Sequence, residues 1–510
     1  MVRGWLEIPN PDPQTESEAA KKTHTPMNLP KIIACLLMFA PLLGHAAESQ
    51  RKPNIIYVLA DDLGWTDLGV QGSRYYETPN IDRLAAEGAR LTRYHNCQNC
   101  QPTRAALMTG QYGARTGVYT VGGIDRFDWR SRPLAPVENV TKLPLEKTTI
   151  AQALKTAGYA TGMFGKWHLG EDGGFHPGKR GFDEAIVSMG VHFNFQTNPK
   201  TDYPKGQYLA DFLTEKAEQF IRAHKDGPFF LYLPHFGVHA PHEAKPSWIE
   251  HFKTKQGEGG HKNPVYAAMI ASVDESVGRL MALLDELHIA KDTVFVFSSD
   301  NGGVGGYERE GLSKGGEGSI TDNAPLRSGK GSLYEGGTRV PFIMRWPGVT
   351  KPGSTNDVPA IHVDVFPTLL EVAGAAAPKH QPLDGESLLP LVKDPAAGLA
   401  REAIFQHFPG YLGMGPGKWR TTPVSLIEVG DWKLLEYLEH NTLELYNLKD
   451  DIGETTNLAQ RLPDKAAELH AKLVVWRKTI GAPMPAPNTQ ADPQRPGKPS
   501  KSGKAGRRKK

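Results

Sequence analysis

The residues with the most distinctive chemistry lie in a short stretch around Cys100. Pro102 follows this cysteine at the second position and Arg104 at the fourth. A thiolate is both a nucleophile and a metal ligand. Two aspartate-rich segments lie far away in the sequence, and carboxylates bind divalent cations. We therefore expect a reactive centre at Cys100 that meets these carboxylates around a cation.

Cys97 and Cys100 also form a C-x-x-C pair, which is compatible with a redox pair or with half of a zinc site. A redox pair usually opens a helix near the start of a thioredoxin-like unit, and a structural zinc site needs a second ligand pair that this chain lacks. The third cysteine, Cys35, lies in an N-terminal apolar run. Three cysteines in 510 residues exclude a disulfide framework.

Oxygen ligands gather at two places. Asp61 and Asp62 follow an apolar run, and Asp300 and Asn301 follow another. Three carboxylates and an amide oxygen suit a hard cation, and the sequence has no His or Cys cluster with zinc spacing. The sequence therefore predicts a site for Ca²⁺, with Mg²⁺ as the alternative.

Apolar runs alternate with amphipathic stretches through the first three fifths of the chain. The expected strands are residues 54–60, 160–164, 228–233 and 293–299, and the expected helices are residues 78–88, 148–158 and 266–289. Nearly continuous apolar runs are typical of parallel strands that are buried on both faces. The alternation predicts an α/β fold, with a large, mostly parallel sheet sandwiched by helices.

Polar clusters follow four of these strands. They are Asp61-Asp62-Leu63-Gly64, Gly165-Lys166-Trp167-His168-Leu169-Gly170, His235 with His239-Ala240-Pro241-His242, and Asp300-Asn301-Gly302-Gly303. In open α/β sheets the binding crevice lies outside the carboxyl ends of the strands. Aspartate and asparagine after a strand are also common turn formers, which explains one such cluster better than four.

The pattern changes after about residue 375. Short strands are expected at residues 424–429, 432–438 and 443–448, with a helix at 463–478. This pattern predicts a smaller antiparallel sheet with one helix packed on it. We therefore expect a main unit at residues 48–375, an α+β subdomain at 376–481 and a disordered basic tail at 482–510.

The first 47 residues indicate an N-terminal extension and a signal peptide at about 27–47. Lys31 precedes an apolar run at 32–43, and Gly44-His45-Ala46 supplies small residues for cleavage. The run is too short to span a membrane. We expect a secreted or periplasmic protein whose signal begins at Met27, with no transmembrane segment. The net charge of +3 gives no indication of a nucleic-acid partner.

Five stretches together resemble the formylglycine-dependent, arylsulfatase-like sulfatases of the alkaline phosphatase superfamily. They are residues 53–64, 100–110, 165–170, 300–303 and 329–337. The stretch at Cys100, with its Leu107-Met108-Thr109-Gly110 ending, is highly specific, and the others are specific only in combination. The chain departs from the family pattern at Thr103, where serine is usual. The cysteine, proline and arginine that matter most for conversion are present.

The resemblance implies that a formylglycine-generating enzyme converts Cys100 to formylglycine (3-oxoalanine). The hydrated aldehyde would attack the sulfur of a sulfate ester. The cation would be bound by residue 100 together with Asp61, Asp62, Asp300 and Asn301.

The resemblance also implies roles for the remaining residues. Lys166 and Lys330 would stabilise charge on the sulfate oxygens, and Arg104 would hold the hydrated residue. His239 would protonate the leaving alkoxide, its His-x-Pro pattern selecting it over His235 and His242. His168 would take the second hydroxyl's proton.

The implied activity is that of a sulfuric-ester hydrolase (EC 3.1.6 type), with a sulfated carbohydrate as substrate. A phosphonate monoester or phosphodiester hydrolase can share the formylglycine, but residues 165–168 favour the sulfatase. A non-enzymatic relative that binds sulfated glycan is disfavoured because every expected catalytic position is filled. The basic and aromatic segment at 126–132 is a candidate for contact with an anionic substrate.

Overall fold

The computed structural model describes residues 51–312, 320–415 and 418–492. The expected signal peptide lies outside the described residues, and so do residues 493–510 of the expected tail. Among the described residues, no helix is both long enough and apolar enough to cross a membrane.

Eight strands form the main sheet, in the order β10-β2-β9-β8-β1-β7-β5-β6. They are β1 (Asn54–Ala60), β2 (Ala89–Leu91), β5 (Ala160–Gly165), β6 (Glu184–Val187), β7 (Phe229–Pro234), β8 (Thr293–Ser299), β9 (Phe342–Arg345) and β10 (Ser354–Asn356). β9 runs antiparallel to both neighbours, and the remaining pairs are parallel. The expected mostly parallel sheet is confirmed, and all four predicted strands belong to it.

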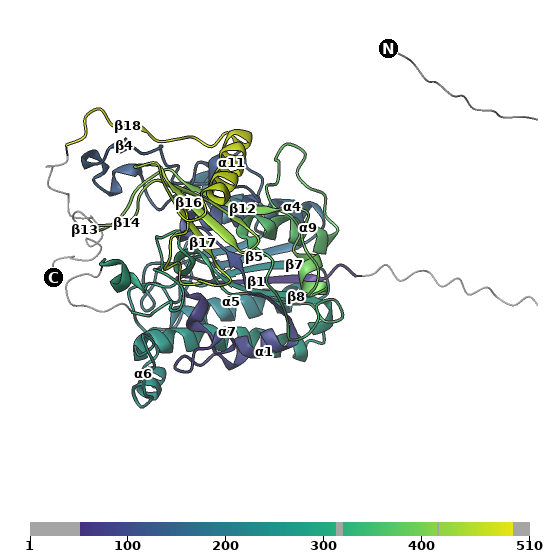
Figure 1. Cartoon of the computed structure of the whole chain (residues 1–510). Coiled ribbons are helices and arrows are strands. Elements are labelled where there is room, and N and C mark those ends of the chain that lie inside the picture. Colours follow the sequence, from purple (N-terminus) through teal and green to yellow (C-terminus); the bar gives the residue numbers. More distant parts are fainter. Residues whose placement is uncertain (1–50, 313–319, 416–417, 493–510) are drawn as a thin grey trace, which may run out of the picture. The chain divides into compact units, whose positions relative to one another are not determined.

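Helices cover both faces of this sheet (Figure 1). One face packs α1 (Pro79–Glu87), α5 (Leu209–His224), α6 (Pro246–Lys253) and α7 (Pro264–Glu286), and the other packs α2 (Cys100–Thr109), α4 (Ile150–Thr156) and α9 (Val365–Ala373). Alternate residues of β1 divide between the faces: Ile56 and Val58 point to the first, Ile55 and Tyr57 to the second. Strand β1 has no solvent-facing side, so it is buried at every position and almost entirely apolar after Asn54.

Helix α7 begins two residues before the predicted start and ends three residues before the predicted end. The Asn263 side chain accepts hydrogen bonds from the backbone N–H groups of Val265 and Tyr266, each at 3.0 Å. Pro264 occupies the first helical position, where its missing N–H costs nothing. The asparagine cap therefore fixes where the helix begins.

The C-terminal part forms a four-stranded antiparallel sheet in the order β12-β15-β16-β17. Its elements are β12 (Ala403–Phe408), β15 (Val424–Val429), β16 (Trp432–Tyr437), β17 (Thr442–Asn447) and the helix α11 (Pro463–Ile480). Leu469 and Leu473 of α11 pack against Ile427 and Leu434 of the sheet. The predicted small sheet with one helix is confirmed, and β12 is a strand that the sequence pattern did not reveal.

Three two-stranded pairings complete the described strands, and one of them joins β3 (Tyr94–His95) to β11 (Ala360–Ile361). β13 (Leu412–Gly415) pairs with β14 (Lys418–Thr421) in a hairpin. β18 (Ala486–Pro487) pairs with β4 (Leu134–Ala135). Part of the expected disordered tail is thus an ordered strand, because backbone hydrogen bonds to a neighbouring segment need no apolar core of their own.

Candidate active site

The four polar clusters lie at one edge of the main sheet. Asp61 and Asp62 follow β1, Lys166 follows β5, His239 lies beyond β7, and Asp300 follows β8. β1, β5, β7 and β8 are parallel neighbours, so their carboxyl ends meet. The structure therefore brings together residues that are far apart in the sequence, such as Asp62 and Asn301, which are 239 positions apart.

Cys100 lies at the same edge of the sheet and is the first residue of helix α2. Pro102 is tolerated in the first turn, where the missing N–H has no helical partner. Arg104 lies one turn further along the same face, as the i,i+4 spacing requires. Thr103 accepts a hydrogen bond from the backbone N–H of Cys97 at 3.0 Å and donates one to the Asn99 carbonyl at 3.2 Å. The Thr103 hydroxyl therefore holds the loop before the helix in place, and a serine hydroxyl can make the same two hydrogen bonds.

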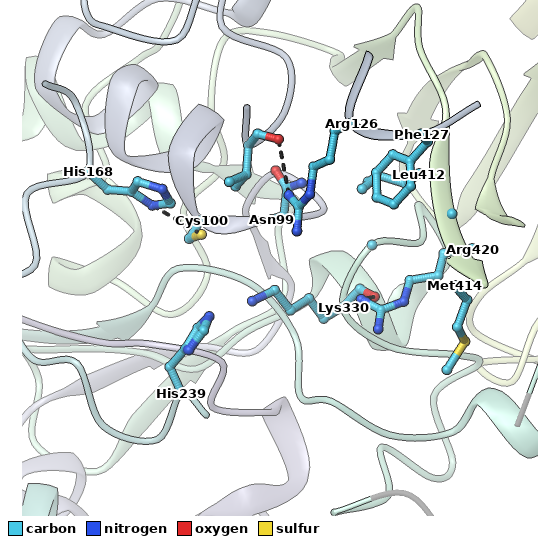
Figure 2. A pocket seen from close by; sticks show the side chains of 13 residues that line it. Asn99, Cys100, Arg126, Phe127, His168, His239, Lys330, Leu412, Met414 and Arg420 are labelled. Carbon is cyan, nitrogen blue, oxygen red and sulfur yellow. Dashed lines mark hydrogen bonds between the residues drawn. The ribbon is translucent and has the colours of Figure 1, made fainter. Parts of the chain in front are cut away.

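Cys100 is buried and opens into a pocket of about 140 Å³ (Figure 2). The pocket is lined by Asn99, Cys100, Val121, Arg126, Phe127, His168, His239, Lys330, Gly331, Leu412, Gly413, Met414 and Arg420. The Cys100 Sγ lies 3.4 Å from Nδ1 of His168. Burial raises the pKa of the Cys100 thiol. An unconverted Cys100 is therefore a protonated thiol and a poor nucleophile.

Arg104 is fully buried and ties the helix to the carboxylates. Its Nε and Nη2 donate to Oδ2 of Asp300 at 3.1 and 2.7 Å, and Nη2 also lies 3.3 Å from Oδ2 of Asp61. Its Nη1 donates to the carbonyl of Lys166 at 2.5 Å. The guanidinium thus fixes the position of residue 100 relative to three strand ends.

Three buried carboxylates face three cations at the floor of the site, of which Arg104 and Lys166 are buried and Lys330 is partly buried. Lys166 pairs with Asp61, Lys330 lies 2.6 Å from Oδ1 of Asp62, and Arg104 pairs with Asp300. Burial opposes the charge on Lys330, but Asp62 raises the pKa of this lysine above its ordinary value. Burial, with Asp61 nearby, raises the pKa of Asp300 to about 6.

Two oxygen atoms among these residues have no protein partner. They are Oδ1 of Asp61 and Oδ1 of Asn301, both buried. The Asn301 amide donates to Oδ1 of Asp62 at 2.8 Å and to the Gly302 carbonyl at 3.0 Å, which fixes its orientation. One ligand atom each from Asp61, Cys100 and Asp300 lie within 4.8 Å of one another. A buried acceptor without a partner is costly, so this donor set fits a hard divalent cation.

The histidines fall into two groups. His168 and His239 line the pocket, whereas His235 and His242 do not. His235 is buried with its Nε2 3.0 Å from Oγ of Ser276. His239 has Nδ1 2.6 Å from the Ala240 carbonyl, which leaves Nε2 facing Oδ2 of Asp62 at 3.7 Å. Of the three histidines near Pro241, His239 is the one that lines the pocket, and its role as proton donor stays a prediction.

Burial and the neighbouring cations lower the pKa of both pocket histidines. The pKa of His168 falls well below its usual value because of burial, with Lys166 adding to it. Burial, Lys166 and Lys330 lower the pKa of His239 to about 3. An anion bound between the lysines would offset their charge and raise the pKa of His239.

The chain is similar to known proteins over most of its length. A model of the family "Sulfatase" matches residues 53–375. The chain belongs to the sulfatase family. A second model, "N-sulphoglucosamine sulphohydrolase, C-terminal", matches residues 329–479. The protein is therefore a sulfatase that hydrolyses sulfate esters, and the predicted family and enzyme class are confirmed.

Several relatives resemble this sulfatase in sequence or structure. It is 34% identical to a sulfatase of Formosa agariphila, over 89% of this chain and 94% of that protein. It is 33% identical to the human N-acetylgalactosamine-6-sulfatase, over 68% of this chain and 66% of that protein. The crystal structure of Ps i-CgsB in complex with k-i-k-neocarrahexaose has a TM-score of 0.69 and 28% identity, covering 87% of this chain and 94% of that chain.

The structure brings all ten predicted site residues of this sulfatase together, and their roles stay predictions. The sequence indicated one part of the opposite wall of the pocket and missed the other. Arg126 and Phe127 lie in the basic, aromatic segment noted from the sequence, whereas Leu412, Met414 and Arg420 come from the β13–β14 hairpin. The hairpin carried no sequence signal, because nothing local indicates that it folds back over the strand ends.

Proposed function

We propose that this sulfatase removes sulfate from a carbohydrate, using a formylglycine made from Cys100 and a bound Ca²⁺. The observation that carries the proposal is the single pocket that Cys100 shares with His168, His239 and Lys330. The names of the relatives support a carbohydrate substrate. The apolar run at 32–43 supports export, and a formylglycine-generating enzyme would be the maturation partner.

Burial raises the pKa of the Cys100 thiol, so the unconverted residue would be a weak nucleophile, which is consistent with a need for formylglycine. A hydrated formylglycine supplies one hydroxyl that attacks sulfur and a second whose deprotonation expels the sulfate. Arg104, tied to Asp300 and to the Lys166 carbonyl, would hold position 100 in line with the substrate. Conversion also leaves the helix undisturbed, because residue 100 is its first residue.

The cation would be held by Asp61, Asp62, Asp300 and Asn301 together with residue 100. A bound divalent cation supplies Lewis-acid chemistry, lowering the pKa of a hydroxyl and neutralising charge on a sulfate oxygen. The partnerless oxygens of Asp61 and Asn301 support this assignment.

The chain's own side chains account for charge and proton movement. Lys166 and Lys330 would bind the sulfate oxygens as negative charge builds on them. His239 would donate a proton from Nε2 to the oxygen of the leaving alcohol. His168, which is neutral at pH 7 because of its lowered pKa, would accept the proton from position 100 through Nδ1.

We expect sulfate release from sulfated saccharides and an aryl sulfate to require Cys100. The protein would be co-expressed with a formylglycine-generating enzyme, supplied with Ca²⁺, and compared with Cys100→Ala. Loss of release in Cys100→Ala supports the proposal. The mass of the peptide carrying residue 100 reports conversion in the same sample. An aldehyde without release of sulfate contradicts the proposal and favours a phosphonate or phosphodiester substrate, tested with the matching esters.

We also expect Ca²⁺ to raise the melting temperature of the protein. A ligand that binds only the folded state stabilises it by about 2.7 kcal/mol at a hundred times its Kd. The shift should be lost in Asp61→Asn and kept in Asp172→Asn, a change at an exposed carboxylate. Scanning calorimetry with and without chelator measures it, and Mg²⁺ in a parallel arm tests selectivity. An equal shift in Asp61→Asn would contradict the assigned ligand set.

A further inference from the structure

We propose that Arg126 and Arg420 form a second anion subsite, which recognises another negatively charged group on the same substrate. The inference rests on the proposed function. The second group is a sulfate or a carboxylate, so the preferred substrate is a sugar unit, or a pair of linked units, with two anionic groups.

The two arginines reach one pocket from distant parts of the chain. Arg126 is the last residue of the short 3-10 helix η3 (Ile124–Arg126), and Arg420 lies on β14. Both line the pocket that holds Cys100, His168 and Lys330 (Figure 2). Burial lowers the pKa of Arg126, Cys100 acts against this effect, and the positive charge of Arg420 lowers the pKa further. The two guanidinium groups therefore add positive charge to the same pocket.

Neither arginine is neutralised within the part of the chain that the structure describes. At the floor of the site, each of the three cations pairs with a carboxylate. Neither Arg126 nor Arg420 forms an ion pair with any described residue, although Arg130 in the same segment lies 2.6 Å from Asp125. Among the described residues, the wall of the pocket therefore carries two positive charges that no carboxylate balances, which favours an anionic ligand.

Most of the N–H groups of the pair are available to a ligand. Arg126 donates through Nη1 to the Val121 carbonyl at 3.0 Å. Arg420 donates through Nη1 to the Lys330 carbonyl at 3.3 Å, and its buried Nε has no partner. A guanidinium has five N–H donors arranged to bind a carboxylate or a sulfate-like anion in two places.

Arg420 is fixed relative to the catalytic lysine. Its guanidinium lies 4.8 Å from the ring centre of Tyr307, and its side chain crosses directly over Gly331. A Cβ at Gly331 would come within 2.7 Å of Cδ of Arg420, and the φ of +93° at this residue also favours glycine. The loop that carries Lys330 thus sets the separation between the reacting sulfate and the second anion.

The rest of this wall is apolar. Phe127, Leu412 and Met414 line the pocket beside the arginines. An apolar surface next to two cations fits the face of a sugar ring that bears a charged substituent, rather than a free inorganic ion. The reacting sulfate already has Lys166 and Lys330, so the arginine pair is assigned to a different group.

Calorimetric binding to the unreactive Cys100→Ala protein tests this subsite. The ligands are matched pairs of saccharides that differ by one anionic group. One arm adds a sulfate, as in glucosamine 6-sulfate against glucosamine 2-N,6-O-disulfate, and the other adds a uronic carboxylate to a monosulfated disaccharide. We expect at least one pair to show a preference of about 10–100-fold for the doubly charged ligand, the effect of one or two charge-assisted bonds. The pair of saccharides that shows the preference identifies the second anionic group as a sulfate or a carboxylate.

The variants Arg126→Gln and Arg420→Gln, made in the same background, should each reduce this preference at least fivefold. Arg130→Gln, whose arginine is ion-paired and outside the pocket, should leave it unchanged. Absence of a preference in every pair would overturn the proposal. Equal loss of affinity for both members of a pair would also overturn it, since the arginines would then bind the reacting sulfate.

Turnover of an aryl sulfate by the Cys100 protein separates this inference from the proposed function. Turnover without a preference in the binding assay overturns the subsite alone. A preference without turnover supports the subsite and contradicts the sulfatase mechanism proposed above.

Discussion

Replacing His239 with alanine is expected to lower the turnover of a sugar sulfate by about 10²–10⁴-fold, the usual effect of removing a general acid. His242→Ala is the matched control, because this histidine lies three residues away and outside the pocket. We expect it to keep turnover within a few-fold of the parent. Sulfate release measured with both variants, after equal conversion of residue 100, gives the comparison.

The leaving group provides a sharper test of the same role. A sugar alkoxide needs a proton as the S–O bond breaks, whereas a nitrophenolate leaves readily without one. The defect of His239→Ala should therefore be at least tenfold smaller with nitrophenyl sulfate than with a sugar sulfate. An equal defect with both substrates would mean that His239 acts on something other than the leaving group. If His242→Ala loses activity while His239→Ala keeps it, the choice of His239 from the His-x-Pro pattern is wrong.

Replacing Lys433 with methionine is expected to lower the free energy of unfolding by about 3–5 kcal/mol. Lys433 is fully buried on β16, with Nζ 2.8 Å from Oε1 of Glu335 and 2.9 Å from Oε1 of Glu454. Burial opposes its charge, but the two glutamates raise the pKa of this lysine. Without the lysine, the carboxylates remain buried and lose their main counter-charge. The midpoint of thermal denaturation, followed by calorimetry, measures the change.

Lys472→Met is the matched control, because Lys472 pairs with Glu402 on the surface. We expect no measurable change in its melting temperature. The double variant Lys433→Met/Glu454→Gln should recover part of the loss. Burial raises the pKa of Glu454 to about 7, so removing its charge relieves the repulsion with Glu335. A melting temperature of Lys433→Met equal to that of the parent would contradict the assigned role.

This cluster also explains how the C-terminal sheet is attached to the main unit. Glu335 begins α8 (Glu335–Thr338), directly after the loop that carries Lys330, and it lies 3.1 Å from Nε2 of His95. The cluster therefore links β16 to the loop that supplies Lys330. Loss of Lys433 should loosen the attachment of that loop as well as the sheet.

The sequence predicted the fold where local patterns were unambiguous. Strands such as β1 are almost entirely apolar, and this follows from burial on both faces. Helix α7 was predicted from its apolar spacing, whereas its first residue was set by the side chain of Asn263. Strand β12 was missed because its alternating burial is weakly expressed in the residue types.

The candidate site likewise has one part that the sequence predicted and another that it did not. Cys100, the aspartates and Lys166 were recognised because each lies in a specific short motif at a strand or helix end. The sequence by itself therefore determined the family, the reaction class and the expected chemistry at the floor of the pocket. Local motifs carry this information because the carboxyl ends of parallel strands meet wherever such a sheet forms.

Only the tertiary structure decided the second wall of the pocket. Arg126 and Arg420 are 294 positions apart, and neither lies in a motif that names its partner. They face one pocket because the β13–β14 hairpin packs over the strand ends, which is a long-range contact between surfaces. Which charges remain unpaired likewise depends on distances between distant side chains. The reaction class can therefore be recognised from local motifs, whereas the second wall of the pocket depends on the packing of distant segments.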